Sequence, residues 1–127
     1  MSEVYRDDYY TVSLERGFVR LERTPTGYAT LEAMHAANRA LAAAVRKAGV
    51  RRLLLDLRKG PPGRNDEAFE HASAVWRKQL SAEVDRAAIL VRTVAGKLQS
   101  QRLAREEGRV GHNIFMDETE ALEFLLK

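Results

Sequence analysis

Basic residues following two apolar runs are the side chains of this chain that are best placed for chemistry. The runs are residues 51–57 and 86–91, and the basic residues, here called the basic edge, are Arg58, Lys59, Arg64, Arg92 and Lys97. If both runs are parallel strands, their carboxyl ends meet at one sheet edge, where ligands of open α/β sheets bind. Helices expected to begin near Asn65 and Thr93 would direct their positive ends there too. The basic edge is therefore predicted to bind an anion or an acidic protein surface. A solvated rim without a ligand is an equally good interpretation.

Residue types that form common catalytic and metal centres are absent or scattered. The chain has no cysteine, which excludes thiol catalysis and cysteine-ligated metals. His35, His71 and His112 fall on three different expected elements, and none of them pairs with another at the spacing of metal ligands. There is neither a Gly-x-Ser-x-Gly elbow nor a glycine-rich phosphate loop. The sequence predicts that the protein is not an enzyme, with no catalytic residues, no metal site and no cofactor.

Two residues resemble functional ones but are better explained as parts of the framework. Asp56 lies near the end of the first apolar run, where catalytic carboxylates often occur. A carboxylate bonded to nearby backbone amides, or paired with Arg58 or Arg92, is the more common case. Trp76 resembles a binding aromatic, but it shares helical spacing with apolar neighbours, which favours a place in the core.

Length and composition indicate one domain over residues 1–127. The chain has 127 residues, 45% of them hydrophobic, which suffices for a single core. The net charge of +3 is too mild to imply a nucleic-acid partner, and the basic residues flanking 51–57 form two groups about 20 Å apart. No apolar run approaches the roughly 20 residues of a membrane span, and the N-terminus lacks a signal-peptide core. We therefore expect a cytoplasmic protein with no specific nucleic-acid partner. The sequence carries no signal for oligomeric state.

Hydrophobic periodicity predicts the elements that would position the basic edge. Residues 9–14 and 18–23 alternate and predict an antiparallel hairpin. After it come a helix from Thr30 to about residue 47, the strand 51–57, a helix over 66–80 with Asn65 as its N-cap, the strand 86–91, a helix from about 93 to 107, a strand 112–116 and a helix capped by Asp117. The order ββαβαβαβα predicts an α/β fold with a mostly parallel five-stranded sheet. Its N-terminal hairpin is expected at the edge.

This element order resembles the SpoIIAA-like group of STAS domains. The likeness also rests on the Leu-Leu-Leu-Asp-Leu segment at 53–57, on residues 85–91 leading into a lysine-bearing helix, and on the closing segment 114–125. The resemblance implies a small α/β domain with sequential strand order, whose relatives bind protein partners and in some cases nucleotides or lipids. Members that antagonise anti-sigma factors carry a phosphorylatable serine in the loop after the central strand. The corresponding loop here, 58–66, has no serine or threonine, so that switch is not expected.

Two functional hypotheses follow. The leading one is a non-enzymatic STAS-like regulatory or protein-interaction module that binds an unknown protein through its second and third helices and the basic edge. The third helix motivates it, because Val94, Leu98 and Leu103 are its only large apolar residues. The alternative is a carrier or sensor of a small anionic or amphipathic ligand, such as a nucleotide or lipid. An apolar cavity between the first helix and the sheet would favour the alternative.

Overall fold

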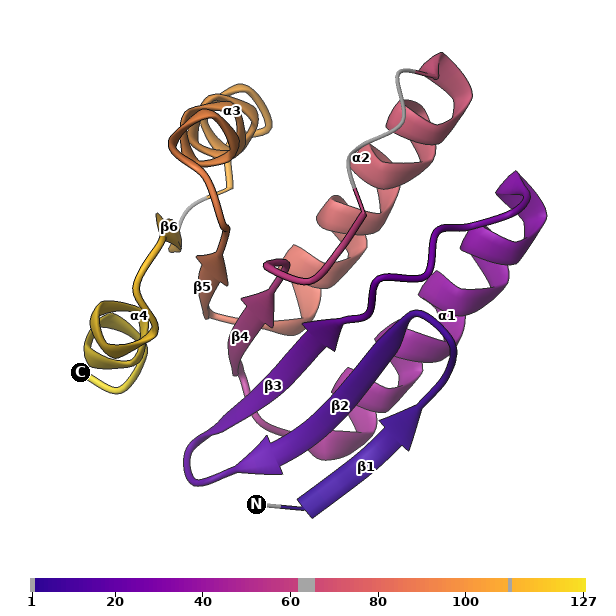
Figure 1. Cartoon of the computed structure of the whole chain (residues 1–127). Helices are drawn as coiled ribbons and strands as arrows, with labels where there is room; N and C mark the ends of the chain where they lie inside the picture. The colour runs from indigo at the N-terminus through magenta and orange to yellow at the C-terminus, as the bar shows by residue number, and fades with distance from the viewer. Residues whose placement is uncertain (1, 62–65, 110) are drawn as a thin grey trace.

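The alternating and continuous apolar runs form one mixed sheet covered by helices. The computed structural model describes residues 2–61, 66–109 and 111–127. In chain order the elements are β1 (Ser2–Arg6), β2 (Tyr10–Glu15), β3 (Phe18–Arg23), α1 (Leu31–Ala48), β4 (Arg52–Asp56), α2 (Glu67–Glu83), β5 (Arg86–Leu90), α3 (Val94–Glu106), β6 (His112–Phe115) and α4 (Glu118–Leu125). The strands lie in the sheet in the order of the sequence, from β1 at one edge to β6 at the other (Figure 1).

Strand direction changes once across the sheet. The pairs β1–β2 and β2–β3 are antiparallel, whereas β3–β4, β4–β5 and β5–β6 are parallel. Because each parallel connection steps to the next strand in the same direction, right-handed crossovers put α1, α2 and α3 on one face. Figure 1 shows α1 and α2 side by side on that face. Helix α4 packs on the opposite face, against β4, β5 and β6.

The α/β class and the element order from β2 onward confirm the prediction, but the prediction of five strands is wrong. The additional strand is β1, which pairs with β2 outside the predicted hairpin. As a result, β1 forms the edge of the sheet in place of the hairpin. The residues of β1 are almost all exposed and follow no apolar alternation, so nothing in their pattern predicted a strand. Backbone pairing holds it, with a register shift between Glu3 and Tyr5.

Helix ends follow the capping signals of the sequence, with one correction. The Thr30 and Thr93 side chains cap α1 and α3, and Gly49 ends α1 in the left-handed conformation, at φ 72°. The N-cap of α2 is Asp66, whose carboxylate accepts two backbone N–H groups. The prediction of Asn65 as this cap is therefore wrong, and Asn65 itself lies outside the described residues.

The sheet separates a large core from a small one. The large core lies under α1 and α2 and includes Leu21, Leu41, Leu53 and Trp76. Trp76 is 7% exposed, which confirms its assignment to the core. The small core lies under α4 and is centred on Leu54, Leu90 and Leu125. In the described part of the chain, no helix is both long enough and apolar enough to cross a membrane.

Candidate functional site

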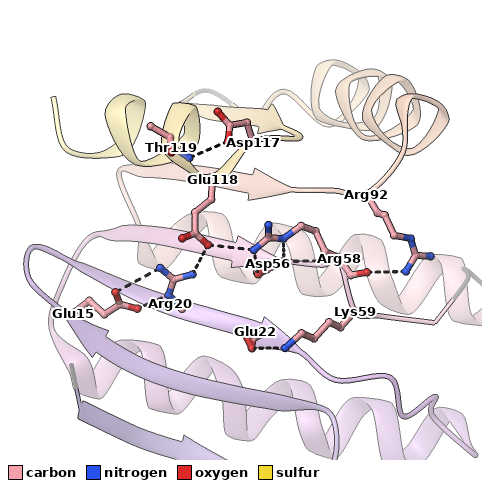
Figure 2. Close-up of polar contacts among 10 residues, drawn as sticks. All are labelled: Glu15, Arg20, Glu22, Asp56, Arg58, Lys59, Arg92, Asp117, Glu118 and Thr119. Atoms are coloured by element: carbon pink, nitrogen blue, oxygen red, sulfur yellow. Dashed lines mark hydrogen bonds and ion pairs between the residues drawn. The ribbon is translucent and has the colours of Figure 1, made fainter.

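Part of the basic edge converges where the sequence places it. Strands β4 and β5 are adjacent and parallel, so Arg58 and Arg92 follow neighbouring strand ends (Figure 2). The Arg92 guanidinium donates a hydrogen bond to the Arg58 carbonyl, over 2.8 Å. Lys59 lies beside them, Lys97 is half-buried in the first turns of α3, and Arg64 lies outside the described residues. Binding at the basic edge stays a prediction.

Carboxylates accompany these cations (Figure 2). Arg58 Nη2 lies 2.8 Å from an oxygen of Asp56 and 3.2 Å from one of Glu118. Lys59 Nζ lies 3.5 Å from an oxygen of Glu22. Because these counter-charges would compete with an anionic ligand, Arg58 and Lys59 are weaker anion sites than their sequence positions indicate.

Asp56 belongs to the framework, as its neighbours in the sequence predicted. Its side chain is buried, 3% exposed, and accepts hydrogen bonds from the backbone N–H, Nε and Nη2 of Arg58 at 2.8 to 3.0 Å. Burial alone would raise the pKa of Asp56, but these bonds and the nearby charges of Arg58 and Arg20 outweigh it and lower the pKa. Arg58 is therefore the partner of a buried carboxylate, which is one of the two pairings that the sequence predicted for Asp56.

A cavity lies on the face of the sheet that α1, α2 and α3 cover. Its volume is about 240 Å³, and it lies between the sheet and the layer formed by α1, α2 and α3. Leu53, Leu55 and Ile89 contribute its floor, while Met34, Trp76 and Leu103 contribute from the helices. Apolar side chains thus form most of a space larger than the roughly 150 Å³ cavity that holds benzene in an engineered protein.

The cavity runs along the strands and opens at their carboxyl ends. Strand register places His112 level with Leu53, and Arg23 level with Leu57, four residues further on. At 3.3 Å per residue these levels are about 13 Å apart. A wider groove shares Arg23, Tyr28, Leu57 and other lining residues with the cavity, so the cavity opens into it. The groove thus lies at the carboxyl ends of the strands, where the sequence predicted a binding site. The described residues of the basic edge are not among those that line it.

A polar atom without a partner lies in the cavity wall. Asn38, on α1, is 5% exposed, and its Oδ1 has no hydrogen-bond partner among the described residues. Such atoms are rare in native proteins because an unmade hydrogen bond costs about 1–3 kcal/mol. A ligand with a hydrogen-bond donor would satisfy this oxygen.

Arg23 lies at the mouth of the cavity and is 7% exposed. Its Nη1 donates to the carbonyls of Tyr9, Thr24 and Thr26 at 2.7 to 3.2 Å. The rings of Tyr9, Tyr10 and Tyr28 lie 4.8 to 5.8 Å from its guanidinium carbon. No Asp or Glu in the described ranges forms an ion pair with it.

At the other end of the cavity, the charged side chains are paired with one another. Arg77 Nη2 lies 2.6 Å from Glu107, and Arg109 Nε lies 3.0 Å from the same carboxylate. The contact between Arg109 and Glu107 is close but too poorly aligned to be a hydrogen bond of Arg109 Nε. Burial lowers the pKa of Arg109. Burial and the charge of Arg109 together lower the pKa of His112 to about 4. His112 is therefore neutral at pH 7.

Neither Arg23 nor Asn38 is among the site residues predicted from the sequence, although the sequence holds a signal for each. Alternation in the strand 18–23 puts Arg23 on the same face as Val19 and Leu21. Asn38 is four residues after Met34, within the apolar stripe of its helix. A polar residue on an apolar face was the signal in both cases.

Comparison with known proteins does not assign the chain to a family. No protein-family model matches it, and no curated protein matches it significantly. Membership of the STAS group therefore stays a prediction. In the described ranges, no group of three His, Asp or Glu side chains is arranged to hold a metal ion.

Proposed function

We propose that this protein is a non-enzymatic binding module that holds a small amphipathic molecule between its helical layer and its sheet. The observation that carries the proposal is an apolar cavity that opens at the carboxyl ends of the strands and contains the unpartnered oxygen of Asn38. Apolar walls favour an apolar body, and the few polar atoms fix its orientation. This is the carrier or sensor hypothesis, with the ligand on the α1–α3 face.

Trp76 allows a direct test, because it is the only tryptophan and it lines the cavity. Titration with 1-octanol, which has an apolar chain and a hydroxyl donor, should change its fluorescence saturably. Ser73 lines both the cavity and the groove, so Ser73→Leu should obstruct the path and weaken binding at least tenfold. Gln79→Leu is the matched control, because Gln79 is exposed on the same helix. No saturable change in the wild type, or equal affinity in Ser73→Leu, would reject the proposal.

A second candidate is the STAS-like regulatory or protein-interaction module, favoured by the surface of α3. Val94 and Leu98 are one helical turn apart and each is 62% exposed. Leu98→Lys should then abolish retention of a protein partner in affinity capture with mass spectrometry, while Gln99→Lys should not. A set of captured proteins that is the same for both variants and the wild type would count against this candidate.

A further inference from the structure

In the described part of the chain, Arg23 lacks the carboxylate partner that three other arginines with largely buried side chains have. Arg20, Arg77 and Arg109, whose side chains are at most 20% exposed, each have a glutamate oxygen within 3.0 Å. Arg23 is also buried, and its hydrogen-bond partners among the described residues are three neutral carbonyl oxygens, all bound by Nη1. Burying a charge is costly unless an opposite charge or strong hydrogen bonds compensate it. An anion at Arg23 would supply that compensation.

The surroundings of Arg23 hold it in position. The three tyrosine rings pack around the guanidinium, with Tyr28 nearest, at 4.8 Å. The backbone of Gly60 packs against its aliphatic stem, since a Cβ at Gly60 would lie 3.0 Å from Arg23 Cγ. A guanidinium fixed by several elements loses little conformational freedom on binding, which favours recognition of a planar anion.

We infer that the cavity takes an apolar monocarboxylate, whose carboxylate pairs with Arg23 at the mouth and whose hydrocarbon body extends along Leu55 and Ile89. The inference rests on the proposed function and specifies its ligand. A carboxylate matches the guanidinium in shape and charge. Arg23 is level with Leu57 in the strand register, and Leu55 lies two residues before Leu57 on the same face of the sheet. The apolar floor therefore begins next to Arg23, on the side away from the cavity mouth. The cavity length of about 13 Å and its volume of about 240 Å³ suit a medium-length chain or a small aromatic acid.

Octanoate and octanamide provide the test, because they have nearly the same shape and differ in charge. Both should change the fluorescence of Trp76 at pH 7, and octanoate should bind about tenfold more tightly. Arg23→Gln should remove this preference by weakening octanoate alone. Arg39→Gln, on the exposed side of α1, makes the same change of charge and should keep the preference.

The outcomes separate the inference from the proposed function. If none of octanoate, octanamide and 1-octanol binds, the proposed function fails, and the inference with it. If octanamide binds as tightly as octanoate to the wild type, the cavity binds ligands but the carboxylate assignment is wrong. If Arg23→Gln binds neither compound, the substitution has disrupted the cavity as a whole, and the preference of the wild type for octanoate over octanamide then decides whether the carboxylate assignment holds. If Arg23→Gln binds octanoate as the wild type does, another cation holds the carboxylate.

Discussion

Arg23 is the last residue of β3, and Arg58 follows the end of β4. Both therefore lie at the carboxyl ends of the parallel strands, but their surroundings give them different roles. Arg58 is two residues from a buried carboxylate and pairs with it, so its charge is used within the framework. Arg23 has aromatic rings and carbonyl oxygens around it and no carboxylate partner among the described residues, and for this reason we infer that it pairs with a ligand. The first relation was open to prediction because it is local. The second depends on what the rest of the fold brings to Arg23.

Removing the Arg58 side chain should destabilise the protein. Arg58→Ala leaves Asp56 buried without its two side-chain hydrogen bonds. We expect the free energy of unfolding to fall by about 1–3 kcal/mol, less than for a fully buried pair, because Arg58 is itself 37% exposed. Urea unfolding measures the change. Lys59→Ala is the control, since its exposed ion pair with Glu22 should contribute less than about 1 kcal/mol. Equal losses in both variants would contradict this assignment.

Among the elements, those with their own capping and periodic signals were the predictable ones. Thr30 and Gly49 marked the ends of α1, and an apolar stripe marked its buried face. Strand β1 had no such signal, because its position depends on backbone pairing with β2 and hardly on buried side chains. The exposure of Val94 and Leu98 agrees with the sparse apolar content that was noted for α3.

Helix α4 should contribute to stability through one side chain in particular. It packs alone against its face of the sheet in the described part of the chain, and Leu125 is fully buried there against residues such as Phe18 and Leu54. Leu125→Ala should lower the free energy of unfolding by about 2–5 kcal/mol through lost burial and the resulting cavity. Leu126→Ala is the control, because Leu126 is 46% exposed and the loss should be well below that range. Similar losses in chemical denaturation would mean that α4 packs differently.

At the scale of the molecule, the sequential sheet explains why the position of the groove could be predicted and the residues that line it could not. Parallel strands place their carboxyl ends together whatever their side chains, and the groove lies there. Which cations remain unpaired depends on contacts between distant segments. Glu118 reaches Arg58 across 60 residues of sequence, for example. Charges counted along the sequence predicted anion binding at the basic edge, which stays a prediction. The position of Arg23 at the cavity mouth, without an ion pair among the described residues, depends on the fold.

The stability of the whole molecule should depend on pH through a half-buried histidine. His112 Nδ1 faces the Arg109 guanidinium at 3.5 Å, and Nε2 faces the Ser81 hydroxyl at 3.4 Å. Because arginine only donates, Nδ1 accepts and Nε2 carries the proton. A second proton would face a cation, which together with burial holds the pKa of His112 at about 4 in the folded state, against 6.5 for an ordinary histidine.

Between these two values the unfolded chain binds a proton that the folded protein excludes, so stability falls as pH drops from about 6.5 to about 4. For a half-buried ring we expect a loss of about 1–2 kcal/mol, and urea unfolding at pH 7 and pH 5 should show most of it. His112→Gln cannot take up this proton and should flatten the pH dependence, while His71→Gln, at an exposed position, should keep it. Below this range the lowered pKa of Asp56 adds a further loss, because protonation of its carboxylate weakens the pair with Arg58. A dependence between pH 7 and pH 5 that persists unchanged in His112→Gln would assign the proton to another group.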